Sequence, residues 1–272
     1  MKYYLMTFSG SLAAVGIYLA AATAHELPRH VRAVGNELRV SVAGKGAPAV
    51  VFECFGIANL EIWSRIQNEI ARDTRTVSYD HGGHWGSEPG AKPRDARQIA
   101  LELRAALRNA NVPPPYVLVG YSFGGIYIRV FAGLYPEEVA GLVFIDPSQE
   151  GFMEYVKAKF PRMNVVTEED RQKQEEWGCQ WESMDQASRA ILPPVPMALI
   201  TGVRTHDPLT RRLVPRWLEE HQKWLKGHPQ ARHVVTGQSG HEVLLSDPEL
   251  IVQTIRQVLG AKSAENLPAA RN

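Results

Sequence analysis

The pentapeptide GYSFG, residues 120–124, stands where a buried strand meets a helix. The continuous apolar run at 116–120 is typical of a strand covered on both faces, and residues 123–135 have apolar side chains at helical spacing. A tight strand-to-helix turn forces its central residue into a strained backbone conformation, and flanking glycines remove side chains that would clash there. The pattern therefore predicts that Ser122 projects its hydroxyl above a sheet edge.

The rest of the chain alternates between strand-like and helix-like segments. Strands are expected at 38–44, 48–55, 74–80, 116–120, 139–146, 196–202 and 232–237, and helices at 60–71, 94–112, 123–135 and 247–260. Such alternation is typical of βαβ units and of a mostly parallel sheet flanked by helices. We expect an α/β core that comprises residues 31–146 and 195–262.

Residues 147–194 break this alternation because they contain no strand-like run. Two stretches, 152–164 and 168–192, have a helical character. We therefore predict a helical cap inserted into the core. Trp177 and Trp181 are among its large apolar side chains, and we expect them to help form a substrate pocket.

A serine hydroxyl is a poor nucleophile unless a base and an orienting acid accompany it. A strand–serine–helix turn of this kind predicts the chain order serine, acid, histidine. His241 is the expected base, because it lies in a glycine-containing loop between the last strand and the last helix. For the acid, Asp207 follows the penultimate strand and is favoured, while Asp146 at the end of an earlier strand is the alternative.

Other histidines are expected to have surface or structural roles. His221 and His228 lie in a polar, basic helical region, which suits a solvated surface. His81 and His84 flank a glycine-rich loop, where stabilising the loop is favoured over contact with substrate.

The composition excludes several classes of function. The chain has 272 residues, enough to bury a sizeable core, and a formal net charge of +1 gives no reason to expect a nucleic-acid partner. Its two cysteines, Cys54 and Cys179, show no zinc-site spacing and no CxxC pair, so we expect no metal site. We also expect no cofactor.

Residues 1–24 read as an export signal. Lys2 precedes an apolar stretch that ends in Ala22-Thr23-Ala24, which resembles a signal-peptide cleavage site. Cleavage would release a periplasmic or secreted protein, in which a disulfide between the two cysteines is permitted, while two free buried thiols are the favoured expectation. The alternative is an uncleaved membrane anchor, because residues 3–24 carry no charge and are about long enough to span a bilayer.

Three stretches carry a resemblance to a known family. They are YDHGGHWGSEPG, PYVLVGYSFGGIYIRVFAGLYPEEVAGLVFID and SGHEVLLSDPELI. Together they resemble bacterial serine hydrolases of the α/β-hydrolase superfamily, and the similarity runs from about residue 38 to 259. The resemblance implies an α/β-hydrolase fold in which Ser122 is the nucleophile, His241 is the base and the Phe123 N–H is one oxyanion donor.

Two positions depart from the family pattern. Relatives usually carry His-Gly or Ala-Gly after the first buried strand, where this chain has Cys54-Phe55, and the alignment then gives Gly56 the place of the second oxyanion donor. We therefore include Phe55 among the predicted substrate-binding residues. The other departure is Tyr121, where relatives commonly have histidine, and we expect it to pack beneath the turn.

The sequence thus predicts a serine hydrolase that cleaves a carboxylic ester, or a related acyl bond, of a small apolar substrate through an acyl-enzyme. Two alternatives stay open. One is a slow or non-catalytic binding protein on the same fold, and the other is a cofactor-free lyase or oxygenase. We expect a small-molecule ester as partner, and contact with a membrane only through the N-terminal segment.

Overall fold

A computed structural model describes residues 27–56, 58–163 and 165–260 of the chain. The predicted signal segment, 1–24, lies outside the described residues. Within those ranges, we find no helix with the length and hydropathy needed to span a membrane.

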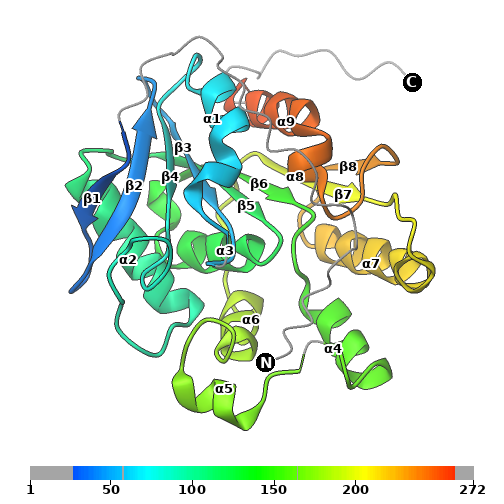
Figure 1. The fold of residues 1–272 in the computed structure, drawn as a ribbon. Helices are drawn as coiled ribbons and strands as arrows, with labels where there is room; N and C mark the ends of the chain where they lie inside the picture. The colour runs from blue at the N-terminus through cyan, green and yellow to red at the C-terminus, as the bar shows by residue number, and fades with distance from the viewer. Residues whose placement is uncertain (1–26, 57, 164, 261–272) are drawn as a thin grey trace.

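A single mixed sheet forms the centre of the described part of the chain (Figure 1). Its strands are β1 (Arg29–Arg32), β2 (Glu37–Ala43), β3 (Ala49–Glu53), β4 (Thr76–Tyr79), β5 (Tyr116–Tyr121), β6 (Val139–Ile145), β7 (Met197–Gly202) and β8 (Arg232–Thr236). They lie in the order β1-β2-β4-β3-β5-β6-β7-β8. Only the pairs β1/β2 and β2/β4 are antiparallel, so the expected parallel core runs from β4 to β8.

Helices cover both faces of the sheet. They are α1 (Ser64–Ile70), α2 (Ala96–Asn109), α3 (Gly124–Leu134), α4 (Glu150–Lys159), α5 (Glu168–Lys173), α6 (Gln180–Ser188), α7 (Pro208–Lys226), α8 (Val243–Ser246) and α9 (Pro248–Gly260), with short 3₁₀ turns η1 (Leu60–Trp63) and η2 (Pro136–Glu138). Helices α1 and α9 pack together on one face, and α2 and α3 pack together on the other (Figure 1).

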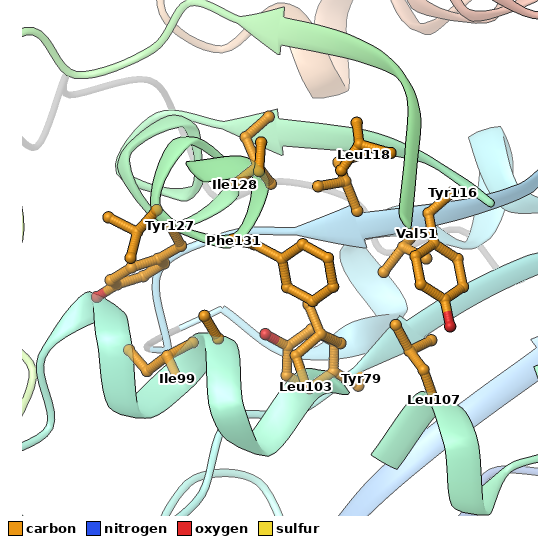
Figure 2. Close-up of a cluster of buried hydrophobic side chains, with 14 of the residues drawn as sticks. Val51, Tyr79, Ile99, Leu103, Leu107, Tyr116, Leu118, Tyr127, Ile128 and Phe131 are labelled. Atoms are coloured by element: carbon orange, nitrogen blue, oxygen red, sulfur yellow. The ribbon is translucent and has the colours of Figure 1, made fainter. Parts of the chain in front are cut away.

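The larger core lies between the sheet and the pair α2 and α3 (Figure 2). Ile99, Leu103 and Leu107 recur at helical spacing on one side of α2 and are almost fully buried. They meet Phe131 of α3 and strand residues such as Leu118. Because both sheet faces are covered, β5 and β6 read as continuous apolar runs in the sequence.

Residues 147–194, which we call the insertion, connect β6 to β7 and contain α4, α5 and α6. The second helical stretch expected there is interrupted between α5 and α6. Gln174 ends α5 with a left-handed φ of 54°, and a Cβ on Gly178 would lie 2.1 Å from the Asp170 oxygen. The insertion packs on the core through α6, which contacts α2 and α3, and through α4, which contacts α7.

Candidate active site

Ser122 occupies the sharp turn between β5 and α3. Its φ is +53°, a left-handed conformation that a non-glycine residue adopts only when its surroundings enforce it. The flanking glycines allow close backbone approach: a Cβ on Gly120 would lie 2.6 Å from the Gly124 oxygen, and one on Gly124 would lie 2.3 Å from the Glu53 oxygen. The turn therefore requires both glycines, as the sequence pattern indicated.

His241 links the serine to a carboxylate. It lies in the loop between β8 and α8, and its Nε2 is 3.0 Å from Ser122 Oγ, while its Nδ1 is 2.7 Å from Asp146 Oδ2. A carboxylate only accepts hydrogen bonds, so Nδ1 carries the hydrogen and Nε2 of the neutral ring accepts from the serine hydroxyl. This arrangement can remove a proton from Ser122 and hold it on the imidazole.

Asp146 directly follows β6 and is almost fully buried. Its Oδ1 accepts hydrogen bonds from the Gly202 N–H at 3.0 Å and from the Trp217 indole N–H at 2.8 Å. Burial works to raise the pKa of this carboxyl, but the hydrogen bond from His241, the electrostatic interaction with the His241 and His221 imidazoles and the hydrogen bond from Trp217 outweigh it and lower the pKa below its usual range. Asp146 therefore stays ionised beside the imidazole.

Asp207, the acid favoured from the sequence, does not reach His241. It caps the N-terminus of α7, where its Oδ2 accepts from the Thr210 N–H at 2.6 Å. Its side chain faces solvent, and the hydrogen bonds from Thr210 lower its pKa. The preference for Asp207 as partner of His241 is therefore wrong, and the alternative, Asp146, takes that place.

The two expected oxyanion donors have different surroundings. Phe123 directly precedes α3, at a helix start whose first N–H groups have no intrahelical partner and where the helix dipole favours negative charge. The Gly56 N–H, by contrast, donates to Glu176 Oε2 at 3.0 Å in buried surroundings. The expectation of Gly56 as an open donor thus disagrees with this geometry, because a carboxylate from the insertion already accepts its hydrogen.

Glu176 belongs to a buried ionic cluster that the sequence analysis missed. His81 lies between two carboxylates, with Nε2 2.7 Å from Glu53 Oε1 and Nδ1 2.9 Å from Glu176 Oε1. Burial works to lower the pKa of His81, but the negative charges of Glu176 and Glu53 outweigh it and raise this pKa to about 10. The cluster also includes a hydrogen bond from Tyr79 to Glu53 and one from Tyr127 to Glu176.

Aromatic rings form an apolar wall beside the turn. The Phe55 ring lies 5.5 Å from the Phe123 ring and 6.5 Å from the Trp177 ring, both in edge-on geometry. Trp181 is placed differently, with the ammonium of Lys157 4.4 Å above its ring centre. The structure thus brings two of the three predicted substrate residues, Phe55 and Trp177, together.

Two further aromatic side chains support the histidine loop and the acid. Tyr121 stacks on the His241 ring at 5.3 Å and donates its hydroxyl hydrogen to the His241 carbonyl oxygen at 2.9 Å. His221 is fully buried, contacting Thr201 Oγ1 at 2.7 Å and the Pro147 oxygen at 2.9 Å, so its predicted surface role is wrong. His228 is half-buried against the Trp224 ring.

Both cysteines, Cys54 and Cys179, are free and buried. Across the part of the chain that the structure describes, no group of three or more His, Cys, Asp or Glu side chains is arranged to hold a metal ion.

Comparison with known proteins agrees with this fold. The family model described as alpha/beta hydrolase fold matches residues 48–177. A solved thermophilic esterase of Thermogutta terrifontis is 19% identical, with a TM-score of 0.62, over 86% of this chain and 98% of that one. The chain has the α/β-hydrolase fold.

Relatives in sequence are distant. An AB hydrolase superfamily protein of Gibberella zeae is 24% identical over 78% of this chain and 86% of its own length. A probable transporter of Hormonema carpetanum, efuK, is 24% identical over 79% of this chain, and the match spans only 39% of that protein. The family model and the structural neighbours agree on the α/β-hydrolase fold.

Proposed function

We propose that this protein is a serine hydrolase that cleaves a carboxylic ester through an acyl-enzyme. The observation that carries the proposal is the continuous hydrogen-bonded chain from Ser122 Oγ through His241 to the buried Asp146. The three groups come from loops after β5, β8 and β6, which meet at the carboxyl edge of the parallel strands.

In the proposed mechanism, Ser122 Oγ attacks the ester carbonyl carbon while His241 Nε2 takes its proton. Asp146 stabilises the resulting imidazolium through Nδ1–H, and the Phe123 N–H stabilises the oxyanion. His241 then gives the proton to the leaving alkoxide oxygen, so that the alcohol departs and an acyl-serine remains. Water, deprotonated by His241, attacks the acyl carbon, and the serine recovers its proton as the carboxylic acid leaves.

The substrate class follows from the aromatic wall. Phe55, Phe123 and Trp177 present ring edges and faces that suit an apolar acyl or alcohol group. The fold shared with the thermophilic esterase and with an enol-lactonase of Burkholderia xenovorans is compatible with acyl-bond chemistry, although fold similarity alone does not select a bond type. We therefore propose small, uncharged esters.

The test combines covalent labelling with turnover. A fluorophosphonate probe should label the wild type on Ser122, as mapped by mass spectrometry, and p-nitrophenyl butyrate should be hydrolysed. Ser122→Ala should abolish both, and His241→Ala should slow labelling by at least about 10³-fold, because the hydroxyl then lacks its base. Unchanged hydrolysis by Ser122→Ala would contradict the proposal.

A slow or non-catalytic binding protein is the second candidate, and the Gly56 contact favours it. An oxyanion-hole donor is typically worth about 3 kcal/mol of barrier, and here the second expected donor is bonded to Glu176. Burst kinetics separate the two candidates. An enzyme releases many equivalents of p-nitrophenol per labelled serine, whereas a slow acyl-binding protein stops near one equivalent.

A further inference from the structure

The insertion contacts the backbone of the turn after β3 through a hydrogen bond. Glu176 lies between α5 and α6, and its Oε2 accepts the Gly56 N–H at 3.0 Å. That turn, residues 54–56, lies against the start of the helix that follows the nucleophile: a Cβ on Gly124 would be 2.9 Å from Cys54 Cα. A shift of the turn would therefore displace the backbone that presents Ser122.

Both oxygens of Glu176 are held in place. Oε1 accepts from His81 Nδ1 at 2.9 Å and lies 3.8 Å from His84 Nε2 and 3.9 Å from Arg94 Nη2. Oε2 also accepts from the Tyr127 hydroxyl at 3.3 Å. A buried carboxylate with this many cationic and hydrogen-bonding neighbours is costly to move, because leaving would strand their charges away from water. Glu176 is therefore firmly held on the Gly56 N–H.

The residue next to Glu176 touches the same turn. The Trp177 ring packs edge-on against Phe55, which in turn packs against Phe123 beside the nucleophile. Glu176 thus holds the turn through the backbone N–H of Gly56, and Trp177 holds it through the side chain of Phe55.

We propose that Glu176 is a positioning residue, which fixes the turn at residues 54–56 against the nucleophile by holding the Gly56 N–H. This inference rests on the proposed esterase function. It differs from a simple structural role, because it places the effect on the geometry of the reacting groups, and hence on kcat, rather than on folding alone.

The experiment measures hydrolysis of p-nitrophenyl butyrate per active site, with sites counted by fluorophosphonate labelling. Glu176→Ala should lower kcat by about 10-fold or more and change KM by less than about threefold. Glu176→Gln should recover much of the lost rate, since its amide oxygen still accepts the Gly56 N–H. Glu175→Gln is the matched control, because Glu175 is exposed and pairs with Lys92, and its kcat should stay within about twofold of wild type.

Glu176→Asp covers the case in which Glu176→Ala does not fold. It keeps the charge beside His81 but is too short to hold Gly56, so kcat should again fall. A folded Glu176→Ala or Glu176→Asp with wild-type or faster turnover per labelled site would overturn the inference and identify Glu176 as an obstruction to the oxyanion hole. If the wild type itself is neither labelled nor active, the proposed function fails instead, so the two failures are distinguishable.

Discussion

At the scale of single residues, two aspartates that look equivalent in the sequence have opposite surroundings. Asp146 is buried and bonded to His241, whereas Asp207 is exposed on a helix end. We predict that Asp146→Asn lowers kcat by about 10³–10⁴-fold, because an asparagine amide at this position favours the wrong imidazole tautomer. Asp207→Asn should retain kcat within about twofold, since asparagine caps a helix equally well.

Pre-steady-state and steady-state hydrolysis of p-nitrophenyl butyrate provide the measurement for this pair. Equal losses in the two variants, or a larger loss in Asp207→Asn, would refute the assignment of Asp146 as the orienting acid.

The Trp217 indole holds the other oxygen of that carboxylate. Trp217→Phe keeps an aromatic ring against Phe152 but removes the N–H that donates to Asp146 Oδ1 at 2.8 Å. A lost hydrogen bond to a charged group is worth about 1.5–3 kcal/mol, so we expect kcat to fall by about 10-fold. Trp224→Phe is the control, because Trp224 lies on the same helix, α7, but packs on Phe144. Matching rates in both variants would argue against a role for the indole N–H.

Ser122 and His241 were predictable because each lies in a local pattern that carries its own geometry. The acid was not, because Asp146 and Asp207 both follow strands of the same parallel sheet, and only the path of each loop decides which carboxylate meets the imidazole. Glu176 was missed for a related reason: its partner Gly56 is 120 positions away in the chain, and no local pattern marks such a contact.

At the scale of elements, the strands and helices around Ser122 were predictable, since burial on both faces gives β5 and β6 continuous apolar runs. The insertion and α7 were harder. His221 was expected at the surface because its neighbours in α7 are polar, yet the helix docks on β7 and buries this one ring between Thr201 and the Pro147 carbonyl. Which side of an amphipathic helix faces the core depends on tertiary packing.

At this scale, the close packing of the turn between β5 and α3 leads to a testable prediction. In Gly124→Ala the new Cβ would lie 2.3 Å from the Glu53 oxygen and 2.9 Å from Cys54 Cα, and both are backbone atoms that cannot move independently. We expect a loss of about 1–3 kcal/mol in the free energy of unfolding, as overpacking costs, together with lost labelling of Ser122. Urea unfolding and fluorophosphonate labelling measure the two effects.

Gly227→Ala is the matched control at the end of α7, because its Cβ would have only the Trp224 oxygen near it, at 3.5 Å. It should unfold at nearly the wild-type urea concentration. Normal stability and labelling in Gly124→Ala would mean that the turn is looser than the geometry implies.

At the scale of the whole molecule, the insertion is joined to the α/β core through charge as well as packing. His81 lies two residues after the end of the core strand β4, Glu53 ends β3, and Glu176 belongs to the insertion. The imidazolium therefore bridges separate parts of the fold. In the described structure this bridge and the contact of α6 with α2 and α3 both hold the insertion against the core. Stability and the shape of the candidate site are therefore coupled through the buried His81 imidazolium.

This coupling predicts how stability depends on pH. The pKa of His81 is raised to about 10 in the folded protein, against about 6.5 in an unfolded chain. The folded state therefore holds one more proton than the unfolded state between these values. The stabilisation is complete below about pH 6.5 and is lost as pH rises toward 10, with a slope of about 1.4 kcal/mol per pH unit.

Urea unfolding of wild type and His81→Gln at pH 7, 8 and 9 tests this slope. The buried thiols also make the folded state less stable as pH rises, because burial raises the pKa of Cys179 to about 11. This contribution is equal in both proteins. The stability advantage of wild type over His81→Gln should therefore shrink by about 1.4 kcal/mol for each pH unit. Parallel stability curves for the two proteins would mean that His81 is neutral in the folded state, and that hydrogen bonding rather than charge joins the insertion to the core.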